Sequence, residues 1–268
     1  MSTDPKEDNF NEFEDNILNS SENIDDSAFL LQAITNLRRI TLDQKSHIKE
    51  YYKIRKMHKK VVDTMINYHQ ADKFDLKIDD NIGNMKTKVN IMEKLNLIET
   101  GFNLATREGA QGFYDLLIYK SSPNMNCITE DFIKSRRYRK PEKVEFLNSM
   151  LNSRLGFFEI TKTERTEGYV YIKDIFTGEE HKIVDIALSG DTNSNDIYLY
   201  TRLIKYHDIV FSTGLNLVFR KKDTFIKKFI LNHKTNYKSE GELLRFKELY
   251  NYFSNNPNKM EIFTNAIK

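Results

Sequence analysis

The chain has 268 residues, of which 39% are hydrophobic and 30% are charged. Its 18 phenylalanines and 14 tyrosines can build a core, so the composition excludes a generally disordered protein and fits one large domain or two small ones. The single cysteine, Cys127, excludes internal disulfides and zinc motifs built on cysteines. Because we find neither a signal peptide nor an apolar run that could span a bilayer, we expect a cytoplasmic protein without membrane contact.

Residues 1–26 form an acidic segment without apolar periodicity, which predicts a disordered tail. Nine acidic residues and one lysine give residues 1–27 a net charge of −8, and because the whole chain carries +2, residues 28–268 carry +10. Such a tail either keeps the chain soluble or folds back onto a basic surface and masks it. The first interpretation is the simpler one.

Residues 27–155 are predicted to form a helical region. Apolar residues recur there at spacings of three and four, which predicts a long helix that begins at an N-cap, Ser27, breaks near Thr41 and ends near Gln70. Its apolar face comprises Ile48, Tyr51, Ile54, Met57, Val61, Met65 and Tyr68.

Further helices are predicted downstream. A second apolar stripe runs through residues 85–98, and residues 112–120 read as a short buried helix. Thr129 is expected to cap another helical turn, and Pro141 is expected at the first position of the next helix. Gly156 would then follow that helix as its C-terminal glycine.

After Gly156 the apolar period changes from 3.6 to 2. Six short apolar runs separated by turn residues predict an antiparallel sheet over residues 156–220. The runs are FFEIT, GYVYIKD, EHKIVDI, IYLYTRLI, DIVFS and LNLVFR. Asp223 then opens C-terminal helices within residues 221–268. The predicted fold is α+β: a helical N-terminal region packed with a small antiparallel β meander or barrel and C-terminal helices.

The run GYVYIKDIFTGEEHKIVDIALSG, residues 168–190, predicts a hairpin with Gly178 at positive φ in its turn. Strand alternation puts His181 and Asp185 on one face, and with Glu179 they would suit a proton relay or a metal site. An apolar residue interrupts this set, and a strand with one solvated face predicts the same pattern. A structural hairpin is therefore favoured, and an enzyme with a site near Glu179, His181 and Asp185 is the weakest of three functional hypotheses.

The hairpin and the strands around it also resemble part of a known group of proteins. A GFFEI strand, a D-x-x-T-G-E hairpin, a VxD strand end, a YTRLI strand and a glycine turn together resemble the β-rich module beside SEC-C zinc motifs in uncharacterised bacterial proteins. The resemblance covers residues 156–220 and implies an antiparallel β module. The cysteine cluster of SEC-C is missing and Cys127 alone cannot replace it, so the resemblance implies no zinc site.

Residues 134–143, KSRRYRKPEK, concentrate positive charge around one tyrosine. Arginine forks and an aromatic face suit phosphate contacts and base stacking. The candidate nucleic-acid-binding residues are Lys134, Arg136, Arg137, Tyr138, Arg139, Lys140 and Lys143. Alternatively, the basic run is only a solvated connector between two helices, which would have the same composition. Two further basic runs, residues 53–60 and 220–228, make a composite anion-binding surface conceivable.

The sequence contains no glycine-rich phosphate loop, nucleophile elbow or metal-binding motif, so we expect no cofactor, no metal and no catalytic residues. The leading hypothesis is a non-catalytic cytoplasmic binding or adaptor protein with an unknown partner; the alternative is a nucleic-acid-binding protein that uses residues 134–143. Basic runs gathered on one face would favour nucleic acid, and an exposed apolar patch a protein partner. A pocket with converging histidine and acidic side chains would favour catalysis.

Overall fold

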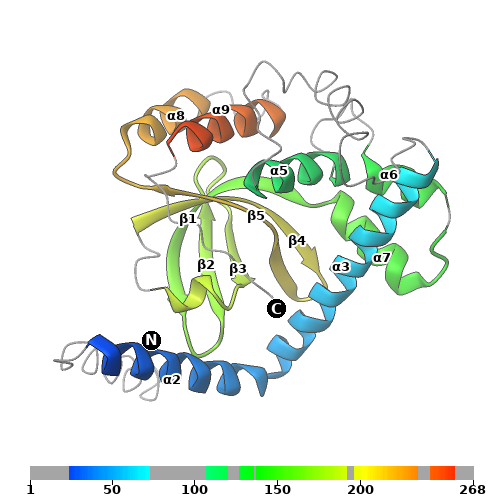
Figure 1. The fold of residues 1–268 in the computed structure, drawn as a ribbon. Coiled ribbons are helices and arrows are strands. Elements are labelled where there is room, and N and C mark those ends of the chain that lie inside the picture. The colour runs from blue at the N-terminus through cyan, green and yellow to red at the C-terminus, as the bar shows by residue number, and fades with distance from the viewer. Residues whose placement is uncertain are drawn as a thin grey trace.

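The computed structural model describes residues 24–72, 107–119, 127–135, 137–191, 196–234 and 242–256. Within these ranges the chain forms seven α-helices and one five-stranded antiparallel sheet, with helices on both sides of the sheet (Figure 1). The predicted α+β class is therefore confirmed. Residues 1–23 of the predicted disordered tail lie outside the described ranges, as does the predicted helical stripe in residues 85–98.

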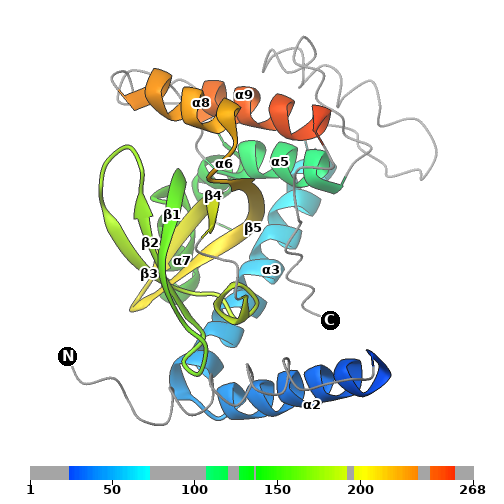
Figure 2. The ribbon, with the colours of Figure 1, turned by 90° about the vertical axis from the view of Figure 1, so that its left-hand side faces the viewer.

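The predicted long helix is two helices, α2 (Ile24–Asp43) and α3 (Ser46–Asp72). The chain turns between them at residues 44–45, close to the predicted break, and α2 runs along the lower edge of the molecule in both views (Figures 1 and 2). Ser27 is not an N-cap, because α2 begins before it. The apolar stripe of α3 is buried as predicted, except that Met57 and Tyr68 are half-buried; His58, the neighbour of Met57, is buried.

Three short helices follow: α5 (Arg107–Ile118), α6 (Ile128–Lys134) and α7 (Pro141–Leu151). Pro141 occupies the first turn of α7 as predicted. Two other predicted helix boundaries are wrong. Cys127 is the N-cap of α6, and the buried hydroxyl of Thr129 instead donates to the carbonyl of Ile118 at 2.7 Å, tying α6 to α5. Gly156 lies inside the first strand rather than after α7.

The sheet has five strands in the order β3-β2-β1-β4-β5, with every neighbouring pair antiparallel. Its edge strands β3 and β5 approach each other without forming a hydrogen-bonded ladder, so the sheet curls but stays open. Two predicted runs, DIVFS and LNLVFR, are one strand, because Gly214 at a φ of +106° carries the chain through a bulge instead of ending it. The strands are β1 (Arg154–Glu164), β2 (Tyr169–Asp174), β3 (Glu180–Val184), β4 (Ile197–Tyr206) and β5 (Ile209–Arg220).

Alternation along the strands sends successive side chains into different cores. Phe157 packs in a core with helices α8 (Thr224–Lys234) and α9 (Glu242–Asn255), whereas its neighbour Phe158 packs in a core on the other face of the sheet. A third core joins α3, α6 and α7 to the ends of β4 and β5. Asp223 opens α8 as predicted, since its carboxylate accepts the backbone N–H of Phe225 at 2.8 Å.

Candidate functional site

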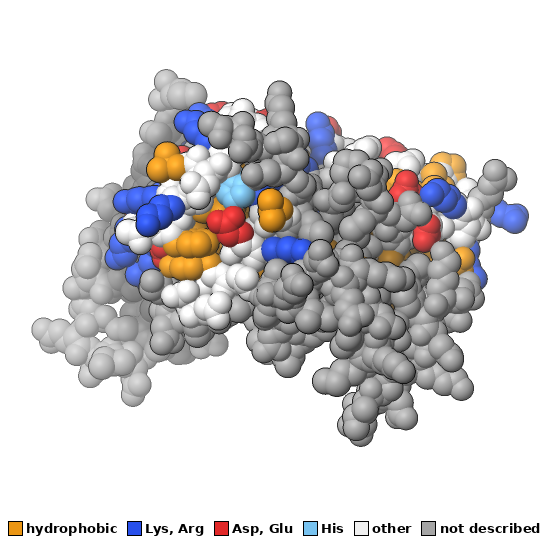
Figure 3. Space-filling model, turned by 90° about the horizontal axis from the view of Figure 1, so that it is seen from above, with side chains coloured by type: hydrophobic (Ala, Val, Ile, Leu, Met, Phe, Trp, Pro, Cys, Tyr) orange, Lys and Arg blue, Asp and Glu red, His pale blue; other side chains and the backbone are white. Residues whose placement is uncertain are grey.

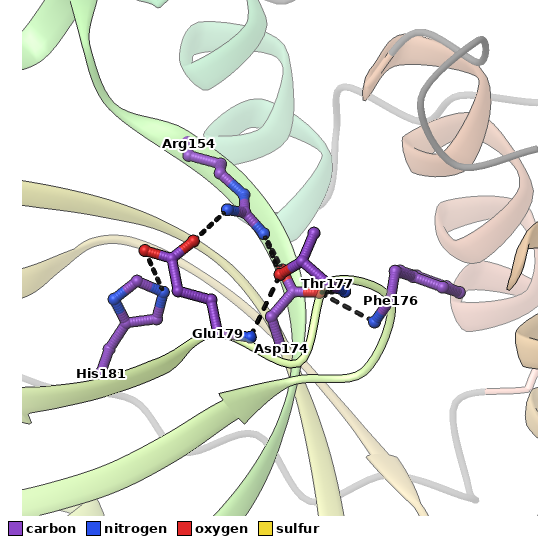
Figure 4. Close-up of polar contacts among 6 residues, drawn as sticks. All are labelled: Arg154, Asp174, Phe176, Thr177, Glu179 and His181. Carbon is purple, nitrogen blue, oxygen red and sulfur yellow. Dashed lines mark hydrogen bonds and ion pairs between the residues drawn. The ribbon is translucent and has the colours of Figure 1, made fainter.

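The hairpin between β2 and β3 is built around the buried carboxylate of Asp174 (Figure 4). Its Oδ1 accepts the backbone N–H groups of Phe176 at 2.8 Å and Thr177 at 2.9 Å, and its carbonyl accepts the N–H of Gly178 at 2.8 Å. Gly178 has a φ of +74°, which confirms the predicted positive angle. The aspartate therefore shapes the turn by supplying acceptors to backbone donors that the strand ladder leaves unpaired.

Arg154 of β1 clamps the hairpin from the side (Figure 4). Its guanidinium forms ion pairs with Asp174 and, at 2.7 Å, with Glu179, and it donates to the hydroxyl of Thr177 at 3.0 Å. These carboxylates are thus engaged in holding the turn onto β1.

The predicted set of Glu179, His181 and Asp185 is only partly assembled. His181 Nε2 lies 3.7 Å from Glu179 Oε1, and burial lowers the pKa of His181 while the Glu179 carboxylate opposes that shift. Asp185 lies beyond the other end of β3, where its Oδ1 accepts the N–H of Leu188 at 3.0 Å. Among the described residues, no group of three His, Cys, Asp or Glu side chains is placed to hold a metal ion.

The basic run of residues 134–143 connects α6 to α7. The guanidinium of Arg137 lies 3.9 Å above the ring of Tyr68 in α3, and the ammonium of Lys143 lies 4.2 Å from the ring of Tyr138. Tyr138 is half-buried and meets the ring of Phe132 edge-on at 5.2 Å. Lys134, Arg139 and Lys140 are exposed, and Arg136 lies outside the described residues.

A groove lies against this run, with a cavity volume of about 570 Å³. All but one of its lining residues are apolar or aromatic, so it has an apolar floor, and the exception is the cationic Arg139 of the basic run. The lining residues are Phe132, Ile133, Tyr138, Arg139, Val144 and Leu147. We call this feature the α6–α7 groove.

The three basic runs do not gather on one face. Helix α8, which holds much of the run 220–228, lies at the left of Figure 1 and α6 and α7 lie at its right, and α8 packs in a different core from α6 and α7. Seen from above, the visible Lys and Arg side chains form separate groups (Figure 3). Part of each distant run is also engaged internally, since Arg55 donates to the carbonyl of Ser212 at 2.6 Å and Lys221 pairs with Glu159 at 2.6 Å.

A second cavity, which the sequence did not predict, lies between α3, α5 and β5 and has a volume of about 350 Å³. We call it the α3–α5–β5 pocket. Asp115 of α5 is buried in its lining: Oδ1 accepts from Arg202 Nε at 2.8 Å and Oδ2 accepts from the Thr213 hydroxyl at 2.9 Å. The side chain of Arg202 is completely buried, so this is an ion pair removed from water.

His58 and Tyr119 complete the polar part of the pocket. His58 Nε2 and the Tyr119 hydroxyl are 2.6 Å apart. Burial, assisted by the charge of Arg55, lowers the pKa of His58 from 6.5 to about 3, and burial raises the pKa of Tyr119. Both side chains are therefore uncharged near pH 7.

A bulge in β5 forms one wall of the pocket. Arg202 of β4 lies opposite three residues of β5, 213–215, between the paired positions on either side. Gly214, with its φ of +106°, lies in this bulge, and a Cβ built on it meets nothing within 4 Å. The bulge interrupts the ladder where Thr213 reaches the Asp115 carboxylate.

Comparison with protein families gives one match. A model of a family of unknown function, DUF7986, matches residues 45–259. The chain belongs to this family. Neither curated proteins nor solved structures gave a match. The resemblance of residues 156–220 to the module beside SEC-C motifs stays a prediction.

The part matched to DUF7986 contains the hairpin, the α6–α7 groove and the α3–α5–β5 pocket, and it excludes the whole of α2. Over the described part of this DUF7986 protein, no helix has the length and apolarity needed to cross a membrane.

The pocket residues do carry a signal in the sequence. Each is a lone polar or charged residue inside an apolar pattern: His58 continues the spacing of Ile54 and Val61, Asp115 interrupts GFYDLLIYK and Arg202 interrupts IYLYTRLI. A buried charge needs a partner, so each such interruption indicates a polar contact with another element. What the sequence does not show is which partner each one meets.

Proposed function

We propose that this protein is a non-catalytic binding or adaptor protein that takes an acidic, apolar-containing segment of a partner protein in the α6–α7 groove. The observation that carries the proposal is the pairing of an apolar groove with a cationic edge. Apolar side chains of a bound segment would fill the groove while its carboxylates meet Arg139, Lys140 and Lys134.

The arrangement of Tyr138 favours a peptide over a nucleic acid. Base stacking requires an accessible aromatic face, whereas the ring of Tyr138 has the Lys143 ammonium over it and the Phe132 ring at its edge. Ile133 and Val144 in the groove are half-buried and offer aliphatic surface, which suits apolar side chains better than phosphates. The separation of the basic runs also favours a peptide, because a long nucleic acid would need a continuous basic surface.

We place this binding function in the cytoplasm. The one cysteine, Cys127, is buried, and burial raises the pKa of its thiol. A protein that needs neither a disulfide nor a reactive thiol is compatible with a reducing compartment.

The test uses a probe taken from the chain itself. Residues 4–22 combine seven acidic residues with four large apolar ones, Phe10, Phe13, Ile17 and Leu18. A fluorescein-labelled peptide of this sequence should bind the full-length protein, as measured by anisotropy, and should bind less tightly as salt increases. Because the chain carries its own copy, a variant that lacks residues 1–23 should bind the peptide more tightly at low salt.

Two matched variants locate the binding. Val144→Trp fills the α6–α7 groove and should weaken peptide binding by about tenfold or more, which corresponds to about 1.4 kcal/mol. Val62→Trp places the same change in the α3–α5–β5 pocket and should leave peptide binding unchanged. Failure of both the full-length and shortened proteins to bind the peptide at low salt would contradict the proposal.

Labelled single-stranded oligonucleotides in the same salt series test the alternative. If residues 134–143 bind nucleic acid, replacing Arg136, Arg137 and Arg139 with alanine should reduce the slope of log K against log salt by about 0.7 for each phosphate that is no longer neutralised. Oligonucleotide binding with that slope change, and no peptide binding, would replace the adaptor proposal with the nucleic-acid one.

A further inference from the structure

The α3–α5–β5 pocket is separate from the groove and has a different character. His58, Asp115 and Tyr119 in its lining are buried, whereas Thr213 and the apolar side chains of Val62 and Ile66 are half-buried. It is therefore a hollow with a polar interior and apolar sides, which is the usual make-up of a small-molecule site. We infer that this pocket binds a small, uncharged ligand with an apolar, ring-sized body and at least one hydrogen-bonding group.

Charge balance argues for an uncharged ligand. The carboxylate of Asp115 and the guanidinium of Arg202 neutralise each other at 2.8 Å, and His58 is neutral beside Tyr119. A charged ligand would have to leave water for a lining that supplies no net opposite charge, and that transfer is unfavourable. A neutral hydroxyl or amide can instead share hydrogen bonds with the Tyr119 and Thr213 hydroxyls.

The states of these groups argue for binding rather than catalysis. A general base works best with a pKa near the operating pH, and burial lowers the pKa of His58 to about 3. Each Asp115 oxygen already accepts a hydrogen bond, and burial keeps Tyr119 protonated. The pocket is thus a set of fixed hydrogen-bonding groups, which suits recognition.

The bulge in β5 distinguishes this pocket from an ordinary gap in the packing. In a regular β4–β5 ladder one residue of β5 would face Arg202, but three residues, 213–215, do so, and Gly214 takes a positive φ. The place where its Cβ would stand is open, so β5 itself leaves room beside the polar groups. Bulges of this kind commonly re-aim side chains at binding sites, and here the re-aimed side chain is Thr213.

The size of the pocket sets the size of the ligand. A volume of about 350 Å³ is at the small end of the range of about 300–1,000 Å³ that ligand pockets occupy. Ile66, Ile118 and Leu215 supply the apolar surface. A single substituted ring fits these limits, and a nucleotide or a peptide does not.

Four probes of similar size and different charge test the inference on the full-length protein: phenol and benzamide, which are neutral, benzoate and benzylammonium. Two-dimensional ¹H–¹⁵N NMR reports binding through the amide signals of Thr213 and Gly214. Phenol or benzamide at millimolar concentration should shift these signals in a saturable way. Benzoate and benzylammonium should bind with dissociation constants at least about tenfold higher, a difference in binding free energy of about 1.4 kcal/mol.

Val62→Trp, which fills the pocket, should abolish the shifts, whereas Val144→Trp should leave them intact. This is the reverse of the pattern expected for the peptide, so failure of one proposal is distinguishable from failure of the other. If neither neutral probe shifts the signals of the unaltered protein, or if a charged probe binds as tightly as a neutral one, the inference is wrong. The unaltered protein decides this even if Val62→Trp fails to fold.

Discussion

Asp174 and Asp115 are both buried carboxylates that contact an arginine, but they are held in different ways. Asp174 takes two hydrogen bonds from backbone groups two and three residues along the chain, and its partner Arg154 is 34% exposed. Asp115 takes both of its hydrogen bonds from side chains 87 and 98 residues away, and its partner Arg202 is 0% exposed. The first carboxylate shapes a turn, and the second joins a helix to a sheet.

The difference shows how much each site depends on the rest of the fold. The Asp174 turn is made largely by its own segment, D-I-F-T-G-E, with Arg154 as a clamp. The Asp115 pair exists only when α5, β4 and β5 are all in place. We therefore expect changes at Asp115 and Arg202 to affect global stability far more than changes in the hairpin.

The largest expected effect comes from breaking the Asp115–Arg202 pair on one side. Arg202→Met removes the guanidinium and leaves a buried carboxylate with only the Thr213 hydroxyl, which should lower the free energy of unfolding by about 3–5 kcal/mol. Urea denaturation followed by circular dichroism measures this.

The double variant Asp115→Leu with Arg202→Met is the control. With both side chains replaced, no Asp115 carboxylate is left buried without its arginine, so stability should recover substantially toward that of the unaltered protein. A double variant no more stable than Arg202→Met would mean that the loss came from packing around Arg202 and not from an unpaired charge.

The second effect is a dependence of stability on pH, which we expect from His58 in the pocket and much less from His181 in the hairpin. Because the folded pKa of His58 is about 3 and its ordinary value is 6.5, the unfolded chain binds more protons than the folded one between these pH values. Stability is then fully present above pH 6.5 and is lost as pH falls toward 3. Between pH 7 and 5 we expect a loss of about 2 kcal/mol from this residue.

Urea denaturation at half-unit pH steps checks this loss. His58→Gln should flatten the profile between pH 7 and 5, whereas His181→Gln should change it much less, because His181 is partly exposed and Glu179 opposes the lowering of its pKa. Equal slopes in the unaltered protein and in His58→Gln would show that His58 takes up its proton without cost in the folded state.

The same contrast explains what could be predicted from the sequence. The positive φ of Gly178, the turn and the start of α8 at Asp223 depend on neighbouring residues, so a short stretch specifies them. The pairing of Asp115 with Arg202 depends on which elements pack together, and propensity and periodicity do not encode that. The cap predicted at Thr129 failed for the same reason, since its hydroxyl bonds to another helix.

A smaller effect is expected at Arg154. Arg154→Met removes the clamp but leaves Asp174 with its two backbone donors, so stability should fall by only about 1–2 kcal/mol. Because Arg154 is partly exposed, the difference from the unaltered protein should shrink as salt increases. Arg154→Lys should be intermediate, since one ammonium cannot reach both carboxylates with the geometry of a guanidinium. A loss as large as that of Arg202→Met would remove the distinction between the two pairs.

The smallest expected effect isolates the backbone of the hairpin turn. A Cβ on Gly178 meets no atom within 4 Å, so we expect the main effect of Gly178→Val to come from forcing a β-branched residue to a φ of +74°. That strain should cost about 1 kcal/mol or slightly more, seen as a lower melting temperature. Gly178→Asn should cost less, because asparagine adopts this conformation more readily than other non-glycine residues. If valine and asparagine lower the melting temperature equally, the turn is held by the Asp174 hydrogen bonds alone and the glycine is dispensable.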